Sequence, residues 1–220
     1  MIELEKKESI YFLTMDAGEN RWNTTFVREI AKALDTIEDD EGQGALITSS
    51  TDSKFFSNGL DLEWMQAPED HPDGGDREVF GEEFMYLMGR FITLPIPTVC
   101  ALNGHTFGAG FMFALSHDFR IMREDKGFIC ANEMQLGLPI PRPELALFKH
   151  KIPANAFFET VQLSKRWTGT DALKAGIVQE VSSFEELPEA AQRKAKELAP
   201  LANNRKNFGH QKEMLYGENA

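Results

Sequence analysis

The sequence has little cysteine and no long hydrophobic run. Only two cysteines, Cys100 and Cys130, occur in 220 residues, and each lies in an apolar, strand-like segment. There is no CxxC pair, so we expect buried free thiols and neither a disulfide nor a metal site, as suits a reducing compartment. No apolar segment reaches the roughly 18 residues that a spanning helix needs, and we therefore expect no membrane insertion.

Basic residues and targeting signals are also scarce. Lysine and arginine number 23 against 35 aspartates and glutamates, which gives a net charge of −12. Nucleic acid is a poor partner for such a chain, because its phosphates would be repelled. The start MIELEKKES lacks the apolar segment of a signal peptide, and the end GENA is no peroxisomal address of the S-K-L kind. We therefore expect a cytoplasmic protein.

Strand-like and helical segments alternate through residue 131 and are followed by a helical C-terminal quarter, which predicts an α/β fold. At 220 residues the chain is long enough to bury a substantial core. The segment 68–76 is rich in Pro, Gly and Asp and is expected to be a mobile loop. Strands are expected at 10–16, 45–50, 97–104, 119–125 and 127–132. Helices are expected at 24–40 with a cap at Thr24 or Thr25, and at 77–93, 108–117, 143–150, 155–164, 170–175, 184–199 and 204–215.

The stretch NGHTFGAGF, residues 103–111, places three glycines directly before an apolar helical run. A phosphate cradle fits poorly. A P-loop needs a Lys-Ser/Thr pair where Phe111 and Met112 stand, and a dinucleotide fingerprint needs a glycine where Phe113 stands. A tight turn before a buried helix, or a close approach of a ligand to bare backbone, both remain open.

A second turn has the same arrangement. In ALITSS…FFSNGLDLEWM, a buried strand leads through a loop to Gly59 at the start of a helix. A helix start leaves backbone N–H groups without partners, so two such turns facing each other could direct two N–H groups at one oxyanion. The spacing alone is a weak indication, because many α/β proteins repeat strand, glycine and helix.

Three segments taken together resemble the crotonase family of enoyl-CoA hydratases and isomerases. They are FFSNGLDLEWM, PTVCALNGHTFGAGFMFALSHDFRIM and FICANEMQLGLPIP, and the resemblance runs from about residue 11 to 178. It implies a spiral of ββα units over residues 1–165, which would hold the active site. It also implies a helical region, 166–220, that assembles a homotrimer or a dimer of trimers.

The resemblance implies a site for an acyl-CoA thioester on the two turns. The oxyanion hole would be the amides of Leu60 and Ala109, and glycines 108 and 110 would let the thioester oxygen reach Ala109. Neither a metal nor a cofactor is implied, since coenzyme A is part of the substrate. The other implied substrate contacts are Ser57, Asn58, Gly59, Asp61, Leu62, Gly108, Gly110 and Met112. For the CoA phosphates the candidates are Lys54, then Arg21, Arg142 and Lys149.

The number of acidic residues in the site distinguishes the reactions of the family. One of the two glutamates of its hydratases falls on Met112, while the other matches Glu133. A single carboxylate suits the Δ3,Δ2-enoyl-CoA isomerases, and the LGLPIP run resembles their plant-type peroxisomal members. Glu144 is a second candidate, although an ordinary acid in a first helical turn is the simpler interpretation. Hydration, thioester hydrolysis, decarboxylation and non-catalytic acyl-CoA binding remain alternatives. Asp61 is expected to act as a helix cap.

Overall fold

A six-stranded sheet forms the centre of the computed structural model, which describes residues 1–67 and 76–216. Its order is β1-β2-β3-β5-β7-β9, with β1 antiparallel to β2 and every other pair parallel. The inner strands are buried on both faces, as parallel strands covered by helices require. The bounds are β1 (Ile2–Lys7), β2 (Ile10–Met15), β3 (Ala45–Ser50), β5 (Thr98–Leu102), β7 (Phe119–Arg123) and β9 (Glu180–Ser182).

A second, three-stranded parallel sheet builds the site's framework. It consists of β4 (Phe55–Ser57), β6 (His105–Phe107) and β8 (Ile129–Cys130). Each of these strands follows a strand of the large sheet and precedes a helical element: α2 (Leu62–Gln66), α4 (Ala109–Ser116) or the 3₁₀ turn η2 (Glu133–Leu136). The expected ββα units are therefore confirmed. Because the three small strands lie side by side and parallel, the segments that follow them gather at one edge.

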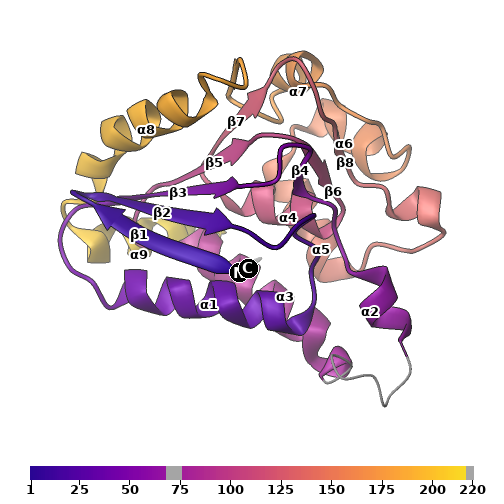
Figure 1. Ribbon diagram of the computed structural model, residues 1–220, viewed down its shortest axis with the longest axis horizontal. Coiled ribbons are helices and arrows are strands. Elements are labelled where there is room, and N and C mark those ends of the chain that lie inside the picture. Colours follow the sequence, from indigo (N-terminus) through magenta and orange to yellow (C-terminus); the bar gives the residue numbers. More distant parts are fainter. Residues whose placement is uncertain (68–75, 217–220) are drawn as a thin grey trace.

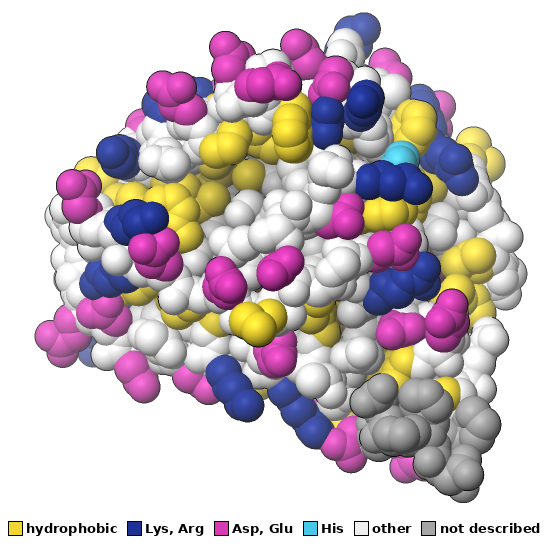
Figure 2. Space-filling view, viewed as in Figure 1, with side chains coloured by type: hydrophobic (Ala, Val, Ile, Leu, Met, Phe, Trp, Pro, Cys, Tyr) yellow, Lys and Arg dark blue, Asp and Glu magenta, His cyan; other side chains and the backbone are white. Residues whose placement is uncertain are grey.

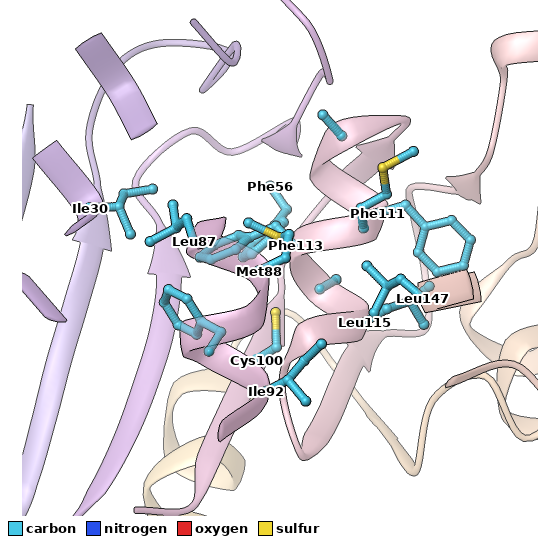
Figure 3. Packing of buried hydrophobic residues seen from close by; sticks show 14 of the residues in the cluster. Ile30, Phe56, Leu87, Met88, Ile92, Cys100, Phe111, Phe113, Leu115 and Leu147 are labelled. Carbon is cyan, nitrogen blue, oxygen red and sulfur yellow. The ribbon is translucent and has the colours of Figure 1, made fainter. Parts of the chain in front are cut away.

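Helices cover both faces of the large sheet (Figure 1). Helix α8 (Leu187–Leu198) packs on one face, while α1 (Thr24–Glu38) and α3 (Phe80–Thr93) lie on the other. Helix α4 is buried at every position, as an apolar helix inside a protein should be. At its centre, the ring of Phe113 lies 5.0 Å from Trp22 and 4.8 Å from Phe91 between centroids. Figure 3 shows Phe113 beside Leu87, Met88 and Phe56.

The C-terminal quarter is helical but belongs to the same core. Strand β9 completes the large sheet, and Trp167 is buried and pairs with Ile129 of the small sheet. The sheet thus continues across the predicted boundary at residue 165, while a role of 166–220 in trimer assembly stays a prediction. Its helical elements are α7 (Gly169–Ala175), α8, η3 (Ala199–Ala202) and α9 (Arg205–Tyr216), and they are preceded by α5 (Arg142–Lys151) and α6 (Ala154–Val161).

Several local predictions were wrong for identifiable reasons. Helix α1 is capped by Asn23, whose side chain accepts from the amide of Phe26, and not by a threonine. The helix expected from residue 77 begins as the 3₁₀ turn η1 (Arg77–Val79), and the one expected from 184 begins at Leu187. Strands β1, β4, β6 and β9 were not predicted. The loop expected to be mobile, 68–76, lies outside the described residues except for Asp76.

Both cysteines lie inside the fold, and the face of the molecule in Figure 2 mixes charges of both signs. Cys100 and Cys130 are buried and free, and burial raises the pKa of the Cys130 thiol to about 11. Within 1–67 and 76–216 no helix is long and apolar enough to cross a membrane, and no cluster of side chains suits a metal ion. Acidic and basic side chains are interspersed over the face shown in Figure 2, which presents no continuous basic surface.

Candidate active site

The two glycine turns are in contact with each other. Gly59 has φ +83°, and a β-carbon added there would lie 2.8 Å from the carbonyl oxygen of Phe107 and 3.7 Å from the amide nitrogen of Ala109. Trp22 fixes the first turn, since its amide donates to the carbonyl oxygen of Gly59 and its own carbonyl accepts from Asp61, both at 2.9 Å. The closeness of the turns therefore depends on glycine at position 59.

The amides of Leu60 and Ala109 have no acceptor among the described residues. The amides of Phe111 and Met112 bond instead to the carbonyl oxygen of Gly108, at 2.9 and 3.1 Å. Ala109 is the first residue of α4, where an amide has no intrahelical partner and the helix dipole favours negative charge. Leu60 and Ala109 both line a cavity of about 390 Å³. The geometry is suited to binding a ligand oxygen.

Glycines 108 and 110 serve different purposes. Gly108 has φ +50°, and a β-carbon there would lie 3.3 Å from Oε1 of Glu133, so glycine leaves room for the carboxylate. A β-carbon on Gly110 would lie 2.5 Å from both Cβ and Oγ of Ser57, so this glycine lets α4 pack against β4. Packing against Ser57 therefore accounts for Gly110, and the expectation that Gly108 opens the way to the amide of Ala109 stays a prediction.

Glu133 lies in the same cavity, at the first position of η2. Its Oε2 is buried and has no hydrogen-bond partner in the part of the chain that the structure describes. Burial raises the pKa of this carboxyl above its ordinary value, while the residue's own backbone amide opposes the shift. A carboxyl with one unpaired oxygen and a raised pKa, in the same cavity as two free amides, is equipped to accept and return a proton.

The structure separates the predicted site residues into two groups. The cavity is lined by Asn58, Leu60, Leu62, Gly108, Ala109, Met112 and Glu133, together with Arg21 and Glu144. Lys54, Ser57, Gly59, Asp61 and Gly110 do not line it, and neither do Arg142 and Lys149.

Ser57 and Asp61, which lie outside the cavity, stabilise the fold through hydrogen bonds. The hydroxyl of Ser57 donates to the carbonyl oxygen of Asn20 at 2.7 Å and accepts from the indole Nε1 of Trp22 at 3.1 Å, so it is fully used inside the fold. Asp61 caps α2 by accepting from the amide of Trp64, which confirms the expected cap. The ammonium of Lys54 lies over the ring of Phe55.

Further residues of the cavity were not predicted. They come from α3 and from the loop around η2, and they are Phe80, Gly81, Phe84, Asn132, Leu136, Leu138, Pro139 and Pro141. The exposed fractions of Leu136 and Leu138, 49% and 41%, are high for leucine, because these side chains edge an open cavity. Their apolar character in a proline-rich loop is the one indication that the sequence offered.

Comparison with known proteins assigns the chain and its fold to a family. The profile of the enoyl-CoA hydratase/isomerase family matches residues 5–213. The chain belongs to this family. It is 34% identical over 181 residues to enoyl-CoA delta isomerase 2, peroxisomal, of Arabidopsis thaliana, covering 81% of this chain and 75% of that protein. To enoyl-CoA delta isomerase 3 of the same plant it is 31% identical over 222 residues, covering 99% and 93%.

A solved structure agrees with this membership of the enoyl-CoA hydratase/isomerase family. The apo structure of an enoyl-CoA isomerase from Mycobacterium tuberculosis superposes with a TM-score of 0.86 at 25% identity, covering 99% of this chain and 91% of that one. The predicted crotonase fold and the resemblance to the plant isomerases are therefore confirmed.

Proposed function

We propose that this chain is a Δ3,Δ2-enoyl-CoA isomerase that moves a double bond of an acyl-CoA through a dienolate. One observation carries the proposal: a single cavity brings together the free amides of Leu60 and Ala109 and the carboxyl of Glu133, whose Oε2 has no hydrogen-bond partner among the described residues. The isomerase names of the Arabidopsis relatives support the same reaction.

The thioester carbonyl oxygen would accept hydrogen bonds from both amides. Glu133 would then remove a proton from C2, and the electron pair of the broken C–H bond would form the C1=C2 bond of the dienolate as the carbonyl pair moves onto the oxygen; protonation at C4 then shifts the double bond to C2=C3. The negative charge that develops on the oxygen is stabilised by donors already in place, which is the largest contribution to catalysis in many enzymes. A proton delivered to C4 completes the 2-enoyl product. The raised pKa of Glu133 makes it a stronger base than an exposed carboxylate.

Met112 distinguishes this cavity from that of a two-acid hydratase. Its thioether is almost fully buried and lines the cavity where the second glutamate of a hydratase would stand. A thioether cannot take a proton from water, so we expect little addition of water. Hydration remains the second candidate function because Glu144 reaches the same cavity from another element.

The assay that tests the function follows two products from one substrate. Incubated with 3-enoyl-CoA, the enzyme is expected to release conjugated 2-enoyl-CoA, measured by its ultraviolet absorbance, with little 3-hydroxyacyl-CoA detected by chromatography. Given 2-enoyl-CoA instead, it should hydrate far more slowly than the order of 10 s⁻¹ of a typical enzyme. Rapid formation of 3-hydroxyacyl-CoA from 2-enoyl-CoA would favour the hydratase.

The coenzyme A part of the substrate needs cationic partners on an acidic protein. Arg21 lines the cavity and is held in place by Glu19, with 2.7 Å between its Nη2 and Oε2 of the glutamate. Asn58 donates to the same carboxylate at 2.8 Å. We propose Arg21 for the phosphate contact ahead of Lys54, whose ammonium is engaged over a ring outside the cavity. No cofactor other than the CoA of the substrate is proposed.

We expect a homotrimer or a dimer of trimers, assembled through residues 166–220. Exposed apolar side chains on this region suggest a surface for another subunit, among them Leu201, Met214 and Leu215, each at least 60% exposed. Light scattering at micromolar concentration measures the mass directly, and a mass near the 24.8 kDa of one chain would contradict the expectation. A cytoplasmic location is likewise a proposal.

A further inference from the structure

A second carboxylate, Glu144, lines the cavity that holds Glu133. It lies in the first turn of α5, which follows the loop after η2 and begins behind Pro141. Its side chain does not cap the helix. Within the described residues, Glu144 makes no hydrogen bond through its carboxyl and no ion pair, so no contact of the fold accounts for an acid at this place.

The electrostatic surroundings of Glu144 raise the pKa of its carboxyl. An acid in the first turn of a helix is ordinarily favoured in its ionised form by the helix dipole. The pKa of Glu144 is instead raised to about 7, first by burial and then by the negative charge of Glu133. Burial and the neighbouring charge therefore outweigh the dipole.

The two carboxyls consequently differ in what raises their pKa. Burial raises the pKa of both, and the charge of Glu133 adds a further rise at Glu144, which favours Glu133 as the ionised member of the pair. When two acids share a cavity and lose their protons at different pH, one can act as the base and the other as the acid of the same reaction.

We propose that Glu144 is the acid that protonates C4, while Glu133 is the base that deprotonates C2. This rests on the proposed isomerase function. Ionised Glu133 takes the C2 proton, and the C2–H electron pair forms the C1=C2 bond of the dienolate. The C3=C4 pair then forms the new bond from C4 to the proton of Glu144, the C1=C2 pair becomes C2=C3, and the thioester carbonyl forms again. The products are 2-enoyl-CoA, protonated Glu133 and ionised Glu144. Return of one proton from Glu133 to Glu144 through water restores the starting state, so atoms and charge balance.

The two proposed roles predict how kcat/KM depends on pH. Activity requires ionised Glu133 and protonated Glu144, so kcat/KM should fall on both sides of an optimum. The fall on the acid side follows Glu133, and the fall on the alkaline side follows Glu144 at about pH 7. Glu144→Gln removes the group that titrates on the alkaline side, and that limb of the profile should disappear.

A label test separates two acids from one. A 3-enoyl-CoA carrying two deuteriums at C2 is converted in ordinary water, and the number of deuteriums in the product is measured by mass spectrometry. With two acids, the wild-type product keeps one deuterium, because C4 receives hydrogen from Glu144. A wild-type product that retains two deuteriums would overturn the proposal, since Glu133 would then carry the same proton to C4.

The variant Glu144→Gln should lower kcat by about 10–100-fold, within the range of general acid catalysis. Part of its product should now keep two deuteriums, because Glu133 must also return the proton. Glu144→Asp should restore part of the rate. The matched control is Glu189→Gln, which removes an exposed acid from the first turn of α8 and should leave rate and pH profile unchanged.

Two results would overturn the assignment of Glu144. One is a Glu144→Gln variant that isomerises within about threefold of wild type. The other is a slower variant that keeps the alkaline limb of its pH profile, because the residue would then act on structure alone. Both differ from a failure of the proposed function, in which the wild-type enzyme itself would not isomerise 3-enoyl-CoA.

Discussion

Glu133→Gln should lower the kcat of isomerisation by about 10²–10⁴-fold, the range that a positioned acid–base group contributes. Glutamine keeps the shape of the side chain but cannot accept the C2 proton. Affinity for acyl-CoA should change little, because the amides of Leu60 and Ala109 remain. Steady-state turnover and equilibrium binding of a non-reactive acyl-CoA, measured on the same preparation, check both parts.

Stability offers an independent measurement on the same variant. The folded-state pKa of Glu133 is raised above its ordinary 4.5, so the native state binds this proton more tightly than the unfolded chain. The carboxyl therefore costs stability as pH rises through that window. Glu133→Gln should melt at a higher temperature than wild type at pH 8, and the difference should vanish well below pH 4.5.

The Glu133→Gln experiment has a matched control variant and two outcomes that would contradict the proposed role of Glu133. Glu63→Gln alters an exposed glutamate on α2 and should leave turnover and melting unchanged. If Glu133→Gln isomerises within about threefold of wild type, the C2 proton is carried elsewhere and Glu144 becomes the leading base. If binding collapses together with turnover, Glu133 is structural and the isomerase proposal loses its main support.

The two glycine turns and Glu133 could be predicted from the sequence because each can be recognised in a short stretch of residues. The two glycine turns and Glu133 each follow a strand within a few residues, and their motifs resemble one family. The prediction of helices was also sound where the apolar period is long, as in α1 and α3, since many positions contribute to the pattern. The prediction of helix ends was weaker. Asparagine and threonine both cap helices, and three such residues, Asn23, Thr24 and Thr25, stand together at the start of α1.

The short strands could not be predicted from periodicity. Strands β4, β6 and β9 have only three residues each, too few to show an alternation. Strand β1 was missed for a different reason: it is an edge strand, charged and largely exposed, so it lacks the apolar composition of an interior strand.

The relation between the two acids depends on tertiary structure. Glu133 and Glu144 are separated by η2 and a loop containing Pro139 and Pro141, and no local pattern says that α5 returns the second acid to the first. Burial, which raises the pKa of both, is a property of the packed cavity. The sequence therefore allowed Glu144 as an ordinary helix acid, and only the fold places it in the cavity.

Ala109→Pro tests the oxyanion hole without removing a side-chain acid. Proline has no amide proton, so one of the two donors is lost. The first position of a helix is where proline is best tolerated, and Ala109 occupies that position in α4. The restriction that proline places on the preceding residue falls on Gly108, which has no β-carbon to clash. We therefore expect a folded enzyme whose kcat falls by about 10²–10³-fold, the effect of losing one oxyanion donor.

Ala109→Gly is the matched control, because it changes the same side chain and keeps the amide. It should retain most of the activity, and circular dichroism should show both variants folded. Equal losses in the two variants would assign the effect to the backbone conformation of the turn and not to the donor. A folded Ala109→Pro enzyme that still isomerises 3-enoyl-CoA at the wild-type rate would mean that the thioester oxygen binds elsewhere, and Leu60 and Ala109 would lose their proposed role together.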